Sequence, residues 1–275
     1  MILITENAGM PRIVQLTDSH VTARGTLWKG QVDSAARLRR QVDAVNALAP
    51  DLVIHTGDVV ELGPLAEGPA EYAAAAEVLA GLTAPLRILP GNHDGRTALA
   101  CAFPDQRWQG APWLNFSMDV DGLHVIGLDS IVEHETGGAF PEDQADWLRS
   151  VLDDRPTLIF LHHPPCPMGL PFMDGFGFDG ADRLAEVLRG HDVLRLACGH
   201  VHSDTAVHWA GTIVAAAEAS CVFIDPDMPA FDALPEGKPR TAGIVPLKLR
   251  LHDWDGSRLS VKTVPTDPPA EQVVI

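Results

Sequence analysis

Five short clusters of Asp, Asn and His lie far apart along the chain, and each follows a short apolar run. The side chains in these clusters that could bind metal ions are Asp18, His20, Asp58, Asn92, His162, His200 and His202. Seven oxygen and nitrogen donors exceed the four ligands of a closed zinc site, but they suit two divalent ions that share one carboxylate. Two ions about 3.5–4 Å apart can activate a water molecule and stabilise both oxygens of an in-line displacement at phosphorus. The clusters therefore predict a dinuclear metal centre for phosphoryl chemistry.

The tetrapeptide Gly91-Asn92-His93-Asp94 is the most informative cluster, and it directly follows the apolar run 86–90. A glycine at the end of a buried strand lets the backbone turn sharply, so the next polar groups project from the strand tip. Histidine titrates near neutral pH, so His93 could exchange protons beside a bound cation. Each cluster alone also fits an ordinary polar turn, but five such turns at five strand ends favour a shared site.

Alternating strands and helices must position these clusters. Five apolar runs predict buried strands, at residues 12–17, 52–56, 86–90, 157–161 and 193–198. Apolar periodicity predicts helices at residues 33–48, 71–82, 97–103, 142–152 and 180–188. Every polar cluster stands at the carboxyl end of a predicted strand, where open α/β sheets bind their ligands. We therefore expect the clusters to converge in a mixed sheet system with helices outside.

The second half of the chain predicts more strand than helix. Asp121-Gly122 is a strong hairpin signal within 114–129. Short strands are expected after residue 205, including 243–252 and 258–263. The length of 275 residues suits one large α/β domain. We expect a single domain at 11–265, with a strand-rich part at 203–265 and a lid or oligomerisation loop at 224–240.

The overall charge weighs against polyanionic partners. The formal net charge is −17, and such a surface repels nucleic-acid backbones and anionic lipids. The run Arg37-Leu38-Arg39-Arg40 has Asp33 and Asp43 at helical spacing, so we interpret it as a solvated helix face. A small anionic substrate remains compatible with this charge, because bound divalent cations would invert the local field. We expect neither a nucleic-acid nor a membrane partner.

Cysteine spacing and the first residues favour a cytoplasmic protein. The four cysteines form no CxxC pair, which favours reduced, mostly buried thiols over a disulfide framework. The start lacks the basic region and apolar stretch of a signal peptide. No apolar run approaches the ~20 residues that a membrane-spanning helix needs.

The clusters and their order resemble the five-block signature of the calcineurin-like metallophosphoesterases. The matching blocks are Asp18-x-His20, Gly57-Asp58, Gly91-Asn92-His93-Asp94, His162 ahead of Pro164, and Gly199-His200-x-His202. The Arg24-Gly25 loop and the segment 161–165 look like the branch of class III cyclic-nucleotide phosphodiesterases and glycerophosphodiesterases. This resemblance implies a four-layer αββα sandwich of two mixed β-sheets flanked by helices.

The resemblance also implies a role for each residue. The first metal ion would be held by Asp18, His20, Asp58 and His202. The second would be held by Asp58, Asn92, His162 and His200, with Asp58 bridging the two ions. The family places its ligand two residues ahead of a proline, which favours His162 and leaves His163 as the alternative. His93 would face the substrate phosphate or the leaving oxygen, and Asp94 would support a histidine.

The expected activity is hydrolysis of small phosphodiesters by a hydroxide that bridges two ions of iron, manganese, zinc or cobalt. In this hypothesis Asn92 and the ions stabilise the non-bridging oxygens, and His93 protonates the leaving alkoxide. Cyclic nucleotides such as cAMP, glycerophosphodiesters and aryl diesters all remain compatible. The loops 22–30, 166–178 and 224–240 should form the walls of the substrate pocket. Three aromatic side chains in the second loop could either stack on a base or pack within the loop itself: Phe172, Phe176 and Phe178.

Several alternatives remain open from the sequence. Protein Ser/Thr phosphatases of this superfamily carry Gly-Asp-x-x-Asp-Arg-Gly, whereas the matching stretch 57–63 contains no arginine. The arginine that binds the substrate phosphate in those phosphatases is missing here, which weighs against a phosphoprotein monoesterase. A broad-specificity phosphomonoesterase, a nuclease or a non-catalytic scaffold that keeps the fold would also fit. A homo-oligomer, dimeric or larger, could form through the late hairpins.

Overall fold

Two mixed β-sheets form the centre of the computed structural model, which describes residues 10–233 and 239–267. The five-stranded sheet has the order β15 (Leu259–Pro265), β14 (Lys248–Trp254), β1 (Arg12–Leu16), β2 (Leu52–His55) and β3 (Leu86–Ile88). The six-stranded sheet has the order β10 (Thr205–Trp209), β11 (Thr212–Ala216), β9 (Val193–Cys198), β7 (Thr157–Leu161), β5 (Leu123–Leu128) and β4 (Phe116–Val120). Strands β1, β2 and β3 run parallel, as do β5, β7, β9 and β11, whereas β14, β15, β10 and β4 pair antiparallel.

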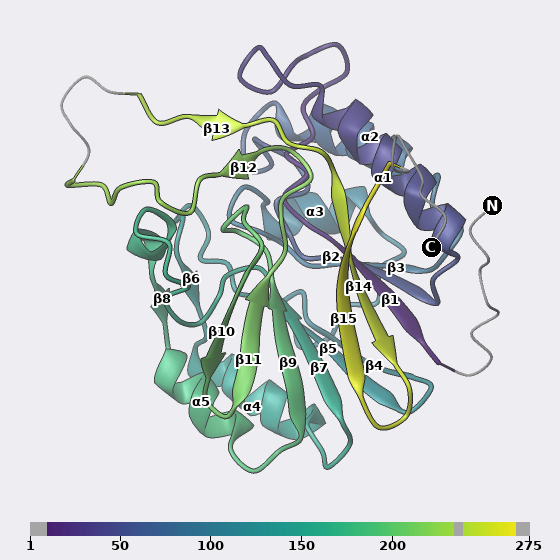
Figure 1. The fold of residues 1–275 in the computed structure, drawn as a ribbon, viewed down its shortest axis with the longest axis vertical. Helices are drawn as coiled ribbons and strands as arrows, with labels where there is room; N and C mark the ends of the chain where they lie inside the picture. Colours follow the sequence, from purple (N-terminus) through teal and green to yellow (C-terminus); the bar gives the residue numbers. More distant parts are fainter. Residues whose placement is uncertain (1–9, 234–238, 268–275) are drawn as a thin grey trace, which may run out of the picture.

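Helices cover the outer face of each sheet (Figure 1). Against the five-stranded sheet pack α1 (Ser34–Leu48), α2 (Gly68–Leu79) and α3 (Arg96–Ala102). Against the six-stranded sheet pack α4 (Glu142–Val151) and α5 (Ala181–Leu188). A third apolar cluster fills the space between the sheets. The predicted four-layer αββα sandwich is therefore confirmed.

Strand β1 shows how the sequence separates these layers. Side chains alternate between the two faces of a strand. Ile13 belongs to the cluster between the sheets, whereas Val14 and Leu16 pack under the helices. Gln15 also points toward the other sheet, where its Nε2 donates a hydrogen bond of 2.9 Å to the Cys198 carbonyl. The two sheets are thus joined by a polar contact as well as by apolar packing.

The late strands differ from the prediction in their bounds. The strand expected at 243–252 begins at Lys248, and a two-residue strand β13 (Ala242–Gly243) pairs instead with β12 (Phe223–Ile224). Pro246 has no backbone N–H to give to a ladder, so the two strands stay separate. The pairing of β12 with β13 brings together the two ends of the loop predicted at 224–240 (Figure 1), and residues 234–238 of that loop lie outside the described part. Strands β10 and β11 join one sheet, while β14 and β15 join the other.

The loop predicted at 166–178 contains a short 3-10 helix, η1 (Met173–Phe176). The two-residue strands β6 (Gly138–Ala139) and β8 (Phe178–Asp179) pair beside it and were not expected from the sequence. Both are too short to produce a readable alternation of apolar and polar residues. The pairing nevertheless fixes the start of α5 and the loop that follows β7.

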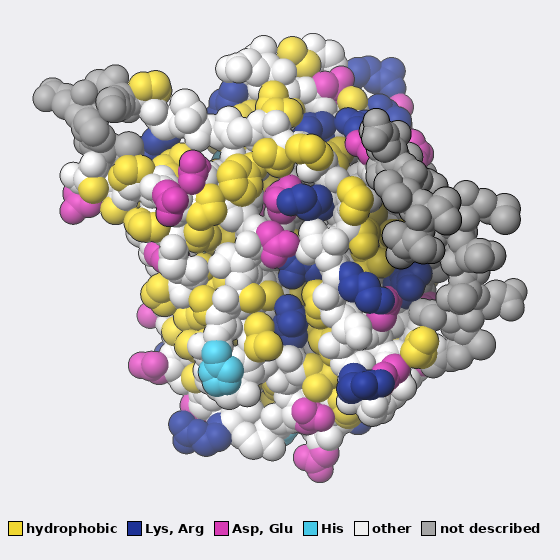
Figure 2. All heavy atoms as spheres, in the orientation of Figure 1, with side chains coloured by type: hydrophobic (Ala, Val, Ile, Leu, Met, Phe, Trp, Pro, Cys, Tyr) yellow, Lys and Arg dark blue, Asp and Glu magenta, His cyan; other side chains and the backbone are white. Residues whose placement is uncertain are grey.

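The basic run on α1 is only partly solvated. Arg39 and Arg40 are exposed, but the Arg37 guanidinium donates to the carbonyls of Ser220 and Val245, each at 2.9 Å. The interpretation of this run as a wholly solvated face was therefore wrong for Arg37. On the face shown in Figure 2, Lys and Arg side chains are interspersed with Asp and Glu. Within the described ranges, none of the helices has the length and apolar character that crossing a bilayer requires.

Candidate metal centre

The fold brings the seven candidate ligands to one edge of the sandwich. Each follows the carboxyl end of a strand: β1 for Asp18 and His20, β2 for Asp58, β3 for Asn92, β7 for His162, and β9 for His200 and His202. Because β1, β2 and β3 run parallel in one sheet and β7 and β9 in the other, these ends meet at the same edge.

The first group contains Asp18, His20, Asp58 and His202, all buried, with ligand atoms within 4.8 Å of one another. Nε2 of His20 lies 3.2 Å from Nε2 of His202 and 3.6 Å from Oδ2 of Asp58. Oδ1 of Asp18 lies 3.4 Å from Nε2 of His202. Four donor atoms thus surround one small volume.

The second group meets the first at Asp58. Nε2 of His162 lies 3.4 Å from Oδ2 of Asp58 and 3.1 Å from Oδ1 of Asn92. The same Asn92 oxygen lies 3.0 Å from Nδ1 of His200. Since Oδ2 of Asp58 is near His20 and His162 alike, this carboxylate occupies the position that a bridging ligand needs.

The protonation pattern of the imidazoles suits bound cations. Nδ1 of His20 donates to Glu61, Nδ1 of His162 donates to the Thr56 carbonyl, and Nδ1 of His202 donates to the Val222 carbonyl, each at 2.8 Å. In its neutral form each ring then keeps a lone pair on Nε2, directed at other acceptors. The lone pairs of His20 and His202 face each other, and that of His162 faces two oxygens. A metal ion in each group would satisfy all of them, so the donors fit a dinuclear centre.

Electrostatics in the site also favour positive charge. Burial lowers the pKa of His162, but the Asp58 carboxylate outweighs burial and raises the pKa to about 9. Burial raises the pKa of Asp58, but His162 and His93 outweigh it and hold this pKa well below its usual value. A buried, ionised carboxylate therefore attracts a cation to the nitrogen beside it, whether a proton or a metal ion.

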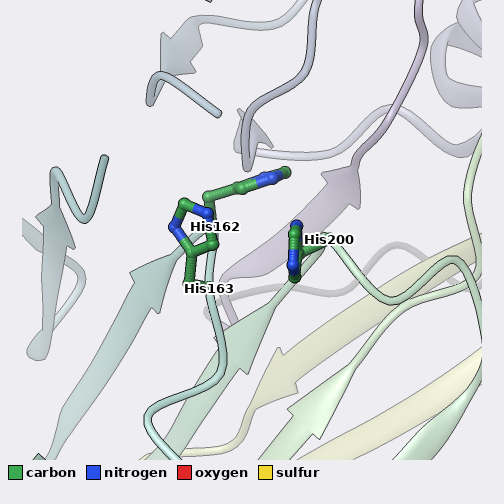
Figure 3. A group of neighbouring side chains, drawn as sticks. All are labelled: His162, His163 and His200. Carbon is green, nitrogen blue, oxygen red and sulfur yellow. The ribbon is translucent and has the colours of Figure 1, made fainter. Parts of the chain in front are cut away.

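His162 and His163 are alternative candidates for one ligand of the second group, and their hydrogen bonds distinguish them. The rings of His162, His163 and His200 gather at the ends of β7 and β9 (Figure 3), with nitrogens within 4.8 Å of one another. Nδ1 of His163 accepts from the Ser130 hydroxyl at 2.9 Å, and its Nε2 donates to the Thr136 carbonyl at 3.1 Å. Both His163 nitrogens have protein partners, whereas Nε2 of His162 faces Asp58. This geometry favours His162 as the ligand.

His93 lies at the border of the site and points into a cavity. Its backbone N–H donates to Oδ1 of Asp58 at 2.8 Å, and its Nδ1 donates to the Glu61 carbonyl at 2.9 Å. Its Nε2 is left for a ligand in the cavity, which His93 helps to line. Burial lowers the pKa of His93, but the carboxylates of Asp58 and Glu61 outweigh burial and raise it. His93 is therefore suited to donate a proton.

Asp94 holds two loops together and does not support a histidine, in contrast to the expectation. Its carboxylate accepts from the backbone N–H groups of Gly91 at 3.0 Å and Val59 at 3.1 Å. It also accepts from the Tyr72 hydroxyl at 3.0 Å. Asp94 thereby fixes the loop that carries Asp58 against the loop that carries Asn92.

Glu61 is a residue of the site that sequence reasoning missed. Its Oε2 accepts from Nδ1 of His20 at 2.8 Å and from the Trp28 indole at 2.9 Å, while its Oε1 accepts from Lys29 at 2.9 Å. Glu61 occupies the place of the second aspartate in the Gly-Asp-x-x-Asp-Arg-Gly pattern, and that position was the available signal. Its carboxylate orients His20 from outside the ligand group.

The backbone around the ligands is unusual. Asp18, His20, Asp58, His200 and His202 all have positive φ, between 43° and 68°. Non-glycine residues rarely adopt this left-handed conformation, and such strain is typical of functional sites. Gly57, with φ of 101°, passes so close to the next loop that a Cβ would lie 2.6 Å from the Gly91 nitrogen. The loops are therefore close-packed behind the ligands.

A cavity of about 250 Å³ opens beside the ligands, lined by His20, Asp58, Asn92, His93, His200 and His202 among others. This volume is near the lower end for small-molecule sites. A second cavity of equal volume lies behind His163. We regard the first cavity as the reaction site, because it alone adjoins both ligand groups and His93.

An αββα sandwich with an Asp/Asn/His centre at its strand ends is the architecture of a metallophosphoesterase. The chain belongs to the calcineurin-like phosphoesterase family, whose family model matches residues 11–204.

Similar proteins agree with this assignment. A probable glycerophosphodiester phosphodiesterase from Arcobacter nitrofigilis is 34% identical over 210 residues, covering 74% of this chain and 76% of the relative. A probable cyclic nucleotide phosphodiesterase from Rhodococcus erythropolis is 36% identical over 219 residues, covering 78% of this chain and 72% of the relative. A dimetal phosphatase from Danio rerio shares the fold, with a TM-score of 0.68, 15% identity, and coverage of 94% of this chain and 96% of that structure.

Proposed function

We propose that the protein is a metal-dependent phosphodiesterase that hydrolyses small phosphodiesters. The observation that carries this proposal is the pair of ligand groups that share Asp58 beside the cavity. Asp18, His20, Asp58 and His202 would hold one ion, and Asp58, Asn92, His162 and His200 the other. When bound, two such ions supply an activated water and positive charge opposite the phosphate oxygens. Iron, manganese, zinc and cobalt all suit this mixed donor set.

The chain's own residues have distinct tasks in the proposed reaction. Asn92 directs its carbonyl oxygen at His162 and His200, which leaves its amide N–H groups to donate to a phosphate oxygen. His93 presents Nε2 to the cavity, and we assign it the proton that the leaving alkoxide takes up as the P–O bond breaks. The products are then an alcohol and a phosphomonoester, and in a cyclic nucleotide both groups belong to one opened molecule.

A small diester is the substrate that the cavity and charge support best. A cavity of about 250 Å³ admits a cyclic nucleotide or a glycerophosphodiester, the substrate classes in the names of the two relatives. The net charge of −17 opposes binding of a nucleic-acid polymer, which weighs against a nuclease. A scaffold without activity has no need of a complete ligand set. Cytoplasmic location and self-association through the late hairpins remain predictions.

Metal-reconstituted protein provides the test. We expect metal-dependent hydrolysis of bis(p-nitrophenyl) phosphate, abolished by Asp58→Ala and kept by Asp105→Ala, an exposed aspartate outside the site. A panel of cAMP, a 2′,3′-cyclic nucleotide, glycerophosphoethanolamine and a phosphomonoester should show higher kcat/KM for diesters. Metal-free, inactive protein after reconstitution would contradict the proposal, and a preference for DNA or for the monoester would replace it with the corresponding alternative.

A further inference from the structure

The cavity beside the metal-binding groups has two aromatic walls that hydrolysis itself does not require. Trp28 lies near His20, with ring centroids 6.4 Å apart. Phe176 lies near His200, with ring centroids 5.6 Å apart and the rings inclined at 71°. His20 belongs to one ligand group and His200 to the other. Aromatic rings therefore border both ends of the centre on the cavity side.

Both aromatic walls are held in place by the protein. The Trp28 indole donates to Glu61 at 2.9 Å, which fixes its ring plane. Phe176 packs edge to face against Phe172 and Phe231, at centroid distances of 5.5 and 5.2 Å. Arg240 in turn stacks over Phe172 and Phe231 at 4.6 and 4.4 Å. Because the half-buried rings of Trp28 and Phe176 are already ordered, a ligand that covers them loses little entropy in ordering them.

The rest of the cavity offers few free polar groups to a substrate alcohol. Apart from the candidate ligands and His93, its polar lining residues are Lys29, Glu61 and Thr136. Lys29 and Glu61 bind each other at 2.9 Å, and the Thr136 carbonyl already accepts from His163. Apart from the other N–H groups of Lys29 and the Thr136 hydroxyl, the hydroxyl groups of a glycerol would find little to bind here. A flat, weakly polar ring could instead pack against the aromatic walls.

We propose that Trp28 and Phe176 determine substrate specificity by holding a planar aromatic group of the diester, such as the base of a cyclic nucleotide, beside the metal centre. This inference rests on the proposed function and narrows it to one class of substrate. Stacking recognises the π-face that every base has, so purine and pyrimidine cyclic nucleotides should both be accepted. A diester without a ring gains nothing from these walls.

The test compares two substrates in the full-length, metal-reconstituted protein. Trp28→Leu and Phe176→Leu should each lower kcat/KM for cAMP about 5- to 100-fold, mainly through KM. Phe176→Leu should not change kcat/KM for glycerophosphoethanolamine by more than about twofold. Trp28→Leu should lower it no more than Trp28→Phe does, because both variants lose the indole donor to Glu61 and differ only in the ring. Trp28→Phe and Phe176→Tyr keep a ring and should retain most of the activity on cAMP. Phe178→Leu is the matched control, because Phe178 lines only the cavity behind His163.

A binding measurement separates stacking from hydrolysis. By calorimetry, a non-hydrolysable phosphorothioate of cAMP should bind both leucine variants more weakly, by the same factor as the change in KM. Equal losses on both substrates, or unchanged binding of the phosphorothioate, would overturn the inference. A parent protein that hydrolyses only glycerophosphoethanolamine would overturn it as well and leave the proposed phosphodiesterase function intact. A parent protein inactive on every diester would refute that function, while the calorimetry would still decide whether the walls bind a base.

Discussion

Glu61 accepts a hydrogen bond from Nδ1 of His20 across 2.8 Å, and this contact determines which ring nitrogen of His20 faces the metal-binding group. With the proton held on Nδ1, the lone pair of Nε2 is directed toward Asp58 and His202. A carboxylate behind a histidine ligand also makes that ligand more basic.

Removal of this carboxylate should weaken metal binding. We expect Glu61→Ala to lower metal affinity about 10- to 100-fold, and Glu61→Gln to lower it less because an amide oxygen can still accept from Nδ1. Titration against a fluorescent chelator measures the change. Glu77→Ala is the control, since Glu77 is exposed and pairs with Arg24. Unchanged affinity in Glu61→Ala would show that His20 needs no support from Glu61.

The role assigned to His93 predicts a dependence on the leaving group. His93→Asn should lower kcat for glycerophosphoethanolamine about 10²- to 10⁴-fold, because an alkoxide must take up a proton as it leaves. The loss for bis(p-nitrophenyl) phosphate should be much smaller, because p-nitrophenolate leaves without protonation. Metal content should stay the same, since Nε2 of His93 faces the cavity. The half-buried His191 provides the control variant His191→Asn. Equal losses on both substrates would exclude the role of proton donor.

The close approach of two loops at Gly57 makes this glycine indispensable. A Cβ at Gly57 would lie 2.6 Å from the Gly91 nitrogen and 2.7 Å from Nδ1 of His162. We expect Gly57→Ala to lower the free energy of unfolding by about 2–4 kcal/mol and to reduce metal occupancy. Gly122 has a similar φ of 84° but no heavy atom within 4 Å of such a Cβ. Gly122→Ala should therefore cost only about 1 kcal/mol in a urea titration and keep the metal. Equal costs would mean that backbone strain alone, without the loop contact, explains both.

The buried histidine of β14 should make the fold sensitive to acid. His252 packs against Phe160, its Nε2 lies 3.3 Å from the Gln15 side-chain oxygen, and its buried Nδ1 has no hydrogen-bond partner. Burial, and then the charges of Arg250 and Arg195, lower its pKa well below the usual value. Below about pH 6.5 the unfolded chain therefore binds a proton that the folded chain does not, and stability falls as the pH falls.

This effect can be isolated with a substitution. In the parent protein the free energy of unfolding should rise with pH between about pH 5 and pH 6.5. His252→Gln should make this rise less steep, by up to about 1.4 kcal/mol per pH unit. Urea titrations in excess chelator keep metal loss out of the comparison. His208→Gln, on the exposed side of β10, is the control. Identical slopes for His252→Gln and the parent would show that His252 is not held neutral.

The sequence predicted the centre of the fold well because its signals were local. The strands β1, β2, β7 and β9 are continuous apolar runs, and each directly precedes a polar cluster. Their bounds were correct to within a residue or two. The strand predicted at 243–252 starts too early, since the observed β14 begins at Lys248. Pro246 interrupts backbone pairing without interrupting the apolar pattern, so the pattern does not show this boundary.

The residues by themselves do not distinguish His162 from His163, and only the resemblance to the family favoured His162. The two are adjacent, and both follow the same strand. What separates them is that Ser130 and Thr136, about thirty residues earlier, occupy both nitrogens of His163. Glu61 was missed for a similar reason, since its partners Trp28 and His20 come from another loop. Contacts between distant loops leave no periodic pattern to read.

The ligand groups draw on both halves of the sandwich. Asp18, His20, Asp58 and Asn92 follow strands of the five-stranded sheet, and His162, His200 and His202 follow strands of the six-stranded sheet. Cations seated among them would cross-link the halves, as a disulfide joins two segments. Protein made in a metal-starved cell would then lose stability as well as activity. Its two sheets would separate more readily and expose the apolar layer between them to proteases.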